Sequence, residues 1–199
     1  MKSLVVATKN LGKIKEIQAF LFELLESVSC ATDFPDFPET VEDGETFEQN
    51  ALKKAREAAL FTGLPALADD SGLVVDALDG RPGVYSARFA GEGAGDAANN
   101  IKLLNDLQSV LPEQRQAAFV CVMAFVTPQG DEHIFTGRVG GRILSTERGT
   151  GGFGYDPLFL VDNFNKTMAE LTIDEKNSIS HRGEALKKFK AFLASKSEK

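Results

Sequence analysis

Residues 64–78 of the chain read Leu64-Pro65-Ala66-Leu67-Ala68-Asp69-Asp70-Ser71-Gly72-Leu73-Val74-Val75-Asp76-Ala77-Leu78. The apolar runs on both sides predict a buried strand. Two neighbouring carboxylates inside such a strand are unfavourable unless cations or hydrogen-bond donors meet them. One interpretation is a strand end or turn with two solvated acids. The other is a site for a hard cation, with a carboxylate left over as a base.

Size and composition are those of an ordinary globular chain. The 199 residues, of which 43% are hydrophobic, suffice for one good-sized domain over residues 1–199 or for two lobes that share a core, and no clear linker divides the chain. No apolar stretch is long enough to span a bilayer, and the apolar run at residues 4–7 is too short for a signal peptide. Cys30 and Cys121 lie far apart in apolar surroundings, which favours two buried free thiols. We therefore expect a cytoplasmic protein with no membrane partner.

The net charge limits the classes of partner. A formal charge of −7 argues against broad nucleic-acid binding, which needs a basic face. It leaves room for a nucleotide substrate, because a small anion needs only a local cationic pocket and a metal ion.

The N-terminal segment predicts a strand, a loop and a helix. Residues 3–7 form an apolar strand, residues 8–13 a short polar loop, and a helix follows with apolar residues at helical spacing, namely Leu11, Ile14, Ile17, Leu21 and Leu24. The start of a helix favours an anion, and Lys13 would add a full positive charge. The alternative is a solvated lysine on a helix face. The glycine spacing of a Walker A loop is absent.

A second helix follows an acidic loop. Residues 27–31 suit a short strand, and the prolines and acids of residues 33–45 predict a loop. Thr46 and Gln49 resemble a capping box that opens a helix reaching about Phe61. Its cations, Lys53, Lys54 and Arg56, face either the acidic loop with the candidate metal site or solvent.

The middle of the chain predicts a turn, a mobile segment, a helix and a hairpin. After the turn at residues 80–83, Arg88 with Ser86 would hold an anion, or Arg88 would pair with Asp76. Residues 92–100 are rich in glycine and alanine, so we expect a mobile segment, followed by a helix through residues 101–107. Residues 117–127 and 133–144 suit two strands joined by a hairpin turn at residues 129–131.

A glycine-dense loop precedes the next predicted strand, at residues 158–161. Its glycines formally satisfy a dinucleotide-binding spacing, but Pro157 and the strand stand where that fingerprint needs a helix. A loop carrying Phe153 and Tyr155 suits close backbone approach to a flat ring or a ribose. The alternative is a flexible hairpin.

The last helix begins with cations. Ser180 is a good N-cap, so His181 and Arg182 fall in the first turn, where the helix dipole disfavours positive charge. This placement suggests an anionic or acceptor-rich partner; the alternative for His181 is a structural role. Early strands alternate with helices and later ones include a hairpin, which predicts an α/β fold with a mixed central sheet flanked by helices.

Six motifs in this order resemble the inosine triphosphate pyrophosphatase family, which acts on non-standard purine nucleoside triphosphates. The motifs are Thr8-x-Asn10-x-x-Lys13, Glu42-x-Gly44-x-Thr46-Phe47 with Asn50-Ala51, Ala68-Asp69-Asp70-Ser71-Gly72-Leu73, Pro82-Gly83-Val84-Tyr85-Ser86-Ala87-Arg88, Gly151-Gly152-Phe153-Gly154-Tyr155-Asp156-Pro157 and Ser180-His181-Arg182-Gly183. Each motif alone is weak, but the six together cover the chain almost end to end.

The resemblance implies a nucleotide cleft between two lobes, a homodimer, and Mg²⁺-dependent hydrolysis of (d)ITP and XTP to the monophosphate and pyrophosphate. It implies that Glu42 and Asp70 hold the metal, that Asp70 is the base, and that Lys13 and Asp69 belong to the catalytic set. Substrate contacts would come from Thr8, Lys9, Asn10, Leu11, Gly12, Lys13, Ser71, Phe153, Gly154, Tyr155, Asp156, Lys176, His181 and Arg182.

Two residues depart from the family pattern. Gly95 stands where relatives often have a hydroxyl that caps the next helix, and Val41 where some have a second acid. Two other hypotheses stay open: a purine nucleotide-binding module without catalysis, and a related pyrophosphatase for pyrimidine or modified nucleotides. The adjacent acids beside Glu42 argue against the first, and the Ser180-His181-Arg182 helix start argues against the second.

Overall fold

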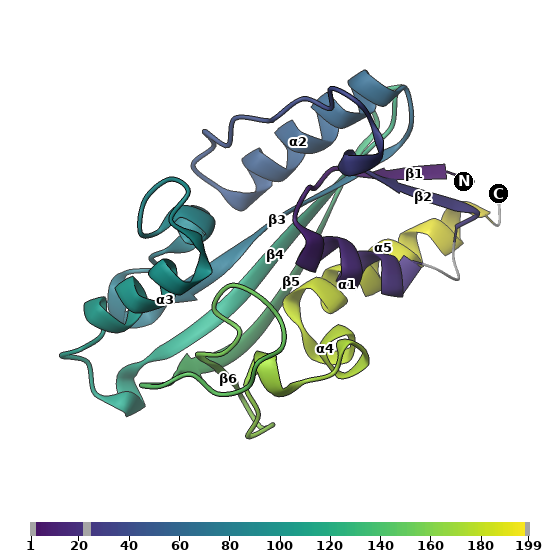
Figure 1. The fold of residues 1–199 in the computed structure, drawn as a ribbon. Coiled ribbons are helices and arrows are strands. Elements are labelled where there is room, and N and C mark those ends of the chain that lie inside the picture. Colours follow the sequence, from purple (N-terminus) through teal and green to yellow (C-terminus); the bar gives the residue numbers. More distant parts are fainter. Residues whose placement is uncertain (1–2, 22–24, 198–199) are drawn as a thin grey trace. The chain divides into compact units, whose positions relative to one another are not determined.

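The computed structural model describes residues 3–21 and 25–197, so the predicted helix position Leu24 lies outside the described residues. Figure 1 shows the helices and strands. The strands are β1 (Ser3–Val6), β2 (Ser27–Cys30), β3 (Ala66–Val75), β4 (Gln116–Val126), β5 (Glu132–Ile143) and β6 (Phe159–Val161). The helices are α1 (Leu11–Leu21), α2 (Phe47–Thr62), α3 (Gly95–Asp106), α4 (Ile173–Ile179) and α5 (His181–Ser197).

The strands form one mixed sheet in the order β2-β1-β3-β4-β5-β6. β1 pairs in parallel with both β2 and β3, whereas β5 and β6 are antiparallel. The predicted α/β fold with a mixed sheet is therefore confirmed. None of the helices in the described segments is long and apolar enough to cross a membrane.

The chain divides into two compact units, each with its own core. The first unit comprises residues 1–70, 121–137 and 182–199, and the second comprises residues 71–120 and 138–181. The boundary falls within strands β3 and β4, at Asp70 and Val120, and within β5 at Gly137.

The first unit packs α1 and α5 together against its strands (Figure 1). Ile14, Ile17 and Leu21 of α1 meet Leu186 and Phe189 of α5 in one buried cluster, which confirms the apolar spacing predicted for α1. The helix α2 buries its alanines, Ala51, Ala55, Ala58 and Ala59.

The core of the second unit joins α3 to the strand ends and the glycine-rich region. Leu103 of α3 and Leu107, the residue after this helix, pack with Leu73 of β3, Phe119 of β4 and Tyr155. Tyr155 therefore belongs to the core, and its hydroxyl donates a 2.8 Å hydrogen bond to the carbonyl of Ser86.

Three local features differ from what the sequence predicted. Residues 95–100 of the segment expected to be mobile form the start of α3, and Asn99 and Asn100 are buried there. Arg88 forms an ion pair with Glu92, and its binding of an anion together with Ser86 stays a prediction. The helix α4 was not predicted, although Thr172 and Glu175 form a capping box at its start.

Adjacent glycines of β5 give a stability test. A Cβ on Gly141 would lie 2.6 Å from the ring of Phe159 and still closer to the carbonyl of Leu160, whereas one on Gly140 would meet only the end of the Asp162 side chain, at 2.9 Å. We expect Gly141→Ala to lower the free energy of unfolding by about 1–3 kcal/mol, since a rigid ring and backbone must move. Gly140→Ala should change it by less than about 0.5 kcal/mol. Urea unfolding followed by circular dichroism compares them, and equal effects would contradict the packing argument.

Candidate active site

The two adjacent acids lie in the middle of the continuous strand β3 and are both buried. The interpretation as solvated acids at a turn is therefore wrong. Successive side chains of a strand point to opposite faces, so Asp69 and Asp70 have different surroundings. Each carboxylate is matched by its own set of cations and hydrogen-bond donors within the first unit.

Asp69 is held by a buried cluster of charges. Its Oδ2 accepts from Arg182 Nε at 2.9 Å, and its other oxygen accepts from Lys13 Nζ. The Arg182 guanidinium also donates to Glu16 Oε2 at 2.5 Å. The side chains of Arg182 and Asp69 are each 1% exposed, so each charge depends on its partners instead of water.

The cluster fixes the protonation of Asp69 and of the thiol beside it. Burial alone would raise the pKa of Asp69, but the charges of Arg182 and then Lys13 outweigh it and hold that pKa well below its usual value. Burial, followed by the charge of Asp69, holds the pKa of the Cys121 thiol well above its usual value. Cys121 therefore remains a thiol, and its Sγ donates to Asp69 Oδ2 at 3.1 Å. Cys30 and Cys121 are both free and buried, as predicted.

Asp70 faces helix α2 and the acidic loop before it. Lys54 Nζ lies 2.8 Å from Asp70 Oδ1 and 3.0 Å from Glu42 Oε1, so one ammonium joins two carboxylates from different segments. Asn50 Nδ2 donates to Asp70 Oδ2 at 3.3 Å. Of the three candidate cations of α2, Lys54 thus faces the site, Lys53 pairs with Asp43 in the acidic loop, and Arg56 pairs with Glu132.

The pKa of Asp70 moves opposite to that of Asp69. Burial raises the pKa of Asp70, and the charges of Lys54 and Lys13 offset this only in part. Burial would lower the pKa of Lys54, but Asp70 and Glu42 more than compensate and raise it, so Lys54 stays charged. Two neighbouring acids therefore differ in proton affinity, which suits them to different chemical roles.

The start of α2 brings Glu42 and Asn50 to Asp70. Thr46 caps the helix by accepting from the Gln49 amide, which confirms the predicted cap, although the Gln49 side chain accepts from Glu45 rather than closing the box on Thr46. Asn50 Oδ1 accepts from the Gly44 amide at 2.8 Å, and a Cβ on Gly44 would lie 2.6 Å from that oxygen. The glycine is therefore required by this close contact.

The loop after β1 reaches the same carboxylates because of the sheet register. Val6 is paired in parallel with Leu67, so the chain that leaves β1 emerges beside Asp69. Asn10 Oδ1 accepts from the Lys13 amide at 3.0 Å and caps the first turn of α1. Thr8 Oγ1 accepts from the Asn10 amide, whereas Lys9, Asn10 and Leu11 are exposed. The positive end of the α1 dipole and the Lys13 ammonium thus lie next to the acids.

The second unit contains the glycine-rich loop, and there Asp156 is the centre. Its Oδ2 accepts from Lys176 Nζ at 2.6 Å and from the Phe153 amide at 2.8 Å. The Lys176 ammonium also lies 4.8 Å from the centroid of the Phe153 ring, within cation–π range. Asp156 and Lys176 are both buried, so this pair fixes the loop to α4.

The glycines of this loop are required by close packing. A Cβ on Gly149 or Gly151 would lie within 2.9 Å of the Ala169 backbone, and one on Gly152 would collide with the Asp156 carboxylate. Gly151 also donates a 3.1 Å backbone hydrogen bond to Ala169. These close contacts are made to the protein's own chain, and the predicted approach of the loop backbone to a ring or a ribose stays a prediction.

Two further predicted site residues, His181 and Arg182, stand on either side of the point in the sequence where the second unit ends and the first unit resumes. His181 is buried in the second unit and stacks on Phe119, with 5.0 Å between ring centroids and 14° between planes. Arg182 begins the last segment of the first unit and binds Asp69 and Glu16. The anionic partner predicted from the unfavourable helix dipole is, for Arg182, the protein's own pair of carboxylates. Ser71, the first residue of the second unit, is partly buried.

The sequence interpretation missed three members of the site. Glu16 binds Arg182, Asn50 binds Asp70, and Cys121 binds Asp69. Asn50 lay within a motif, and a charged residue beside the apolar face of α1 was a signal for Glu16. Nothing in the sequence marked Cys121 as a donor to Asp69.

The donor set fits a divalent ion shared with a phosphorylated ligand. Mg²⁺ usually takes one or two protein carboxylates and completes its shell with phosphate oxygens and water. Glu42 and Asp70 supply two such carboxylates. Across residues 3–21 and 25–197, no group of three or more His, Cys, Asp or Glu side chains is arranged to hold a metal by itself.

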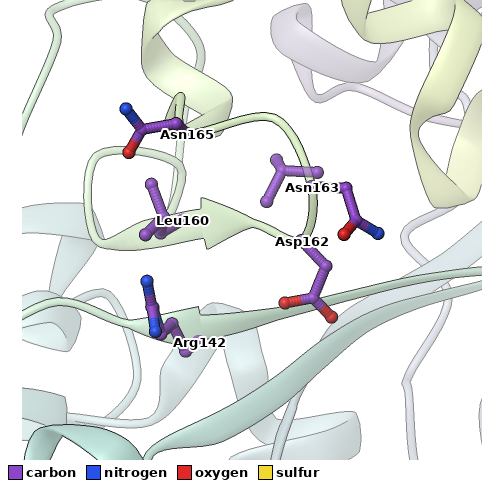
Figure 2. Close-up of a pocket in the computed structure, with 6 residues that line it drawn as sticks. Arg142, Leu160, Asp162, Asn163 and Asn165 are labelled. Atoms are coloured by element: carbon purple, nitrogen blue, oxygen red, sulfur yellow. The ribbon is translucent and has the colours of Figure 1, made fainter.

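A pocket of about 460 Å³ lies elsewhere, along β5, β6 and the turn after β6 (Figure 2). Figure 2 shows Arg142 on β5 and Asp162, Asn163 and Asn165 on that turn. None of the residues that line it is a predicted site residue, and we assign it no role.

The model of the Ham1 family matches residues 4–192. The chain belongs to the Ham1 family. A dITP/XTP pyrophosphatase of Geobacter sulfurreducens is 60% identical over 193 residues, which cover 97% of each chain. One of Exiguobacterium sibiricum is 52% identical over 96% of each chain. The resemblance inferred from the six motifs is therefore confirmed.

Solved structures of the Ham1 family share the fold. A HAM1 protein from Coxiella burnetii has a TM-score of 0.88 and 43% identity, covering 98% of this chain and 100% of its own. A nucleoside-triphosphatase or dITP/XTP pyrophosphatase from Mycobacterium abscessus has a TM-score of 0.75 and 45% identity, covering 94% and 98%.

Replacing Asp69 in this Ham1 protein tests the buried cluster. We expect Asp69→Asn to lower the free energy of unfolding by about 3–5 kcal/mol, because it removes the carboxylate that pairs with the partly buried Lys13 and leaves the fully buried Arg182 with one of its two described carboxylate partners, Glu16. Asp70→Asn is the matched control and should be clearly less destabilising, since Lys54 retains Glu42 as a partner. Urea unfolding at pH 7 measures both variants, and equal losses would contradict the assignment of Asp69 to the structural cluster.

The difference between wild type and Asp69→Asn should also depend on pH. The folded pKa of Asp69 lies below the ordinary carboxyl value of about 3.9 found in unfolded chains. Its stabilisation is therefore fully present above that value and is lost as the pH falls toward the folded pKa. The difference should stay constant between pH 5 and pH 8 and shrink below about pH 4.

Proposed function

We propose that this Ham1-family protein hydrolyses (d)ITP and XTP to the nucleoside monophosphate and pyrophosphate. The observation that carries the proposal is the pair of adjacent buried acids of β3, one neutralised by Arg182 and Lys13 and the other facing Glu42 and Lys54. Relatives up to 60% identical that bear the name dITP/XTP pyrophosphatase support the substrate class.

Glu42 and Asp70 are the residues that would hold Mg²⁺ together with substrate phosphates. When bound, the ion supplies partial neutralisation of the triphosphate and orientation of the phosphorus that is attacked. Asp70 is the proposed base, because burial raises its pKa and strengthens its hold on a proton from the attacking water. Lys54 keeps the two carboxylates close to each other before substrate binds.

The triphosphate is assigned to the loop between β1 and α1. Thr8, Lys9, Asn10, Leu11 and Gly12 would offer hydrogen-bond donors, and Lys13 would stabilise the charge that develops on the leaving pyrophosphate. Asp69 contributes by fixing the Lys13 ammonium, which it contacts directly. A donor oriented in advance stabilises charge in the transition state without reorganising.

The nucleoside is assigned to Ser71, Phe153, Gly154, Tyr155, Asp156, Lys176, His181 and Arg182. Phe153 offers an aromatic face, and Asp156 and Lys176 keep its loop in place. A backbone N–H that donates to purine O6 would favour a 6-oxo purine and oppose the amino group of adenine. Each mispaired buried polar group costs about 1–3 kcal/mol, so a few suffice for discrimination.

The oligomeric state and the cellular location are also proposals. A homodimer follows from the family resemblance. A cytoplasmic location is supported by two buried free thiols, which suit a reducing compartment.

Product analysis tests the reaction. Incubated with Mg²⁺ and ITP, GTP, ATP or TTP, the protein should release monophosphate and pyrophosphate from ITP and turn over ATP far more slowly, as monitored by phosphorus NMR. Diphosphate and orthophosphate would show that a different phosphorus is attacked. Tight ITP binding without turnover would indicate a binding module, and preference for TTP would indicate a pyrimidine enzyme.

Removing the proposed base should abolish catalysis while leaving the fold intact. We expect Asp70→Asn to lower kcat on ITP by about 10²–10⁴-fold, since the amide cannot accept the proton and is a weaker metal ligand. The matched control is Asp43→Asn, an exposed residue beside Glu42 in the same loop that pairs with Lys53, and it should keep near-normal rates. Normal turnover by Asp70→Asn would remove its assigned role.

A further inference from the structure

Two side chains of α3 bind both backbone groups of Gly154. The Gly154 amide donates to Asp96 Oδ2 at 2.7 Å, and the Gly154 carbonyl accepts from Asn100 Nδ2 at 3.2 Å. Asp96 and Asn100 are four residues apart in one helix and therefore project from the same face. We propose that Asp96 and Asn100 are positioning residues that hold the nucleoside-binding loop in its binding conformation, an inference that rests on the proposed function.

The conformation of Gly154 shows what is being held. Its φ of 61° lies in the left-handed region, which costs a non-glycine residue free energy and which glycine adopts readily. A Cβ would meet nothing within 4 Å, so local crowding does not impose this conformation. Glycine has many alternatives in the free chain, so the two hydrogen bonds from α3 restrict it to one.

Asn100 also ties together the two ends of the loop. Besides binding Gly154, its Nδ2 donates to Glu147 Oε1 at 3.0 Å, so one amide group links two residues that lie seven positions apart. Both partners are acceptors, which fixes the NH₂ group toward the loop and sets the orientation of the amide. Asn100 is only 5% exposed, so replacing it with an apolar residue would leave these acceptors without their donor.

The residues next to Gly154 are those assigned to the nucleoside. Phe153 precedes it, with its amide on Asp156 and its ring beside the Lys176 ammonium. Lys176 of α4 thus holds one side of the loop through Asp156, while Asp96 and Asn100 of α3 hold the other side. Release of Gly154 would therefore free the Phe153 ring to move.

Because the purine base lies several bonds from the phosphorus that reacts, loss of this positioning should weaken substrate binding more than chemistry. We expect Asp96→Ala to raise the KM for ITP about five- to tenfold, the effect of one lost hydrogen bond, and to change kcat by less than about threefold. The preference for ITP over ATP should fall as well, since the pocket that distinguishes the bases is less well ordered. A role in stability alone would leave both KM and the preference unchanged.

The variants form a matched set. Asp96→Asn retains an acceptor oxygen and should restore a KM within about twofold of wild type, whereas Asn100→Leu should reproduce the Asp96→Ala effect. Asp106→Ala is the control, since it removes a carboxylate from the same helix that pairs only with Lys102 in the described contacts. Because Asp96 is exposed, Asp96→Ala keeps the test available even if replacement of the buried Asn100 impairs folding.

Amide hydrogen exchange measured by NMR supplies a readout that does not depend on activity. In the protein without substrate, the Gly154 amide should exchange about five- to tenfold faster in Asp96→Ala, and at the wild-type rate in Asp106→Ala. If Asp96→Ala kept the wild-type KM, base preference and Gly154 exchange rate, the inference would be overturned and the proposed function would stand. A wild-type protein that releases no pyrophosphate from ITP would overturn the proposed function, and with it the inference.

Discussion

The buried ion pair between Asp69 and Arg182 is the contact on which the first unit depends. It joins the middle of β3 to the first turn of α5, and Glu16 and Lys13 extend it to α1. Removing two charges from water is expensive, so the pair is a poor way to gain stability and a strict way to fix geometry. Because every charge in the cluster has a partner, β3, α1, α5 and the Lys13 ammonium are held in a single arrangement.

That cluster also explains why two acids stand side by side. Because successive side chains of β3 point to opposite faces, Asp69 faces Arg182 and Asp70 faces Lys54. Asp69 stays ionised and serves as an internal counter-charge, whereas burial raises the pKa of Asp70 and suits it to accept a proton. Neutralising the first acid lets the second share one strand with it, because two uncompensated carboxylates would repel each other.

The sequence predicted what local patterns determine. The strands, the apolar faces of α1 and α5 and the cap at Thr46 follow from spacing and from residues a few positions apart. It did not predict the contact of Asp69 with Arg182, because the residues lie 113 positions apart and only packing brings them together. The start of α3 was missed for a related reason: Gly95 is a weak helix former, but the buried Asn99 holds the helix through the Ala90 amide and the Ala87 carbonyl.

The glycine-rich loop shows why composition alone misleads about order. Its glycines suggest flexibility, yet Gly149 and Gly151 lie against the Ala169 backbone and Gly152 against Asp156, where no side chain fits. A loop that needs glycine for packing loses its freedom on folding, before any ligand arrives. Such a loop binds a nucleoside with little further ordering, so more of the contact energy remains as affinity and base discrimination. Glycine here provides the close fit of a rigid site, and side chains on the neighbouring helices keep that fit in place.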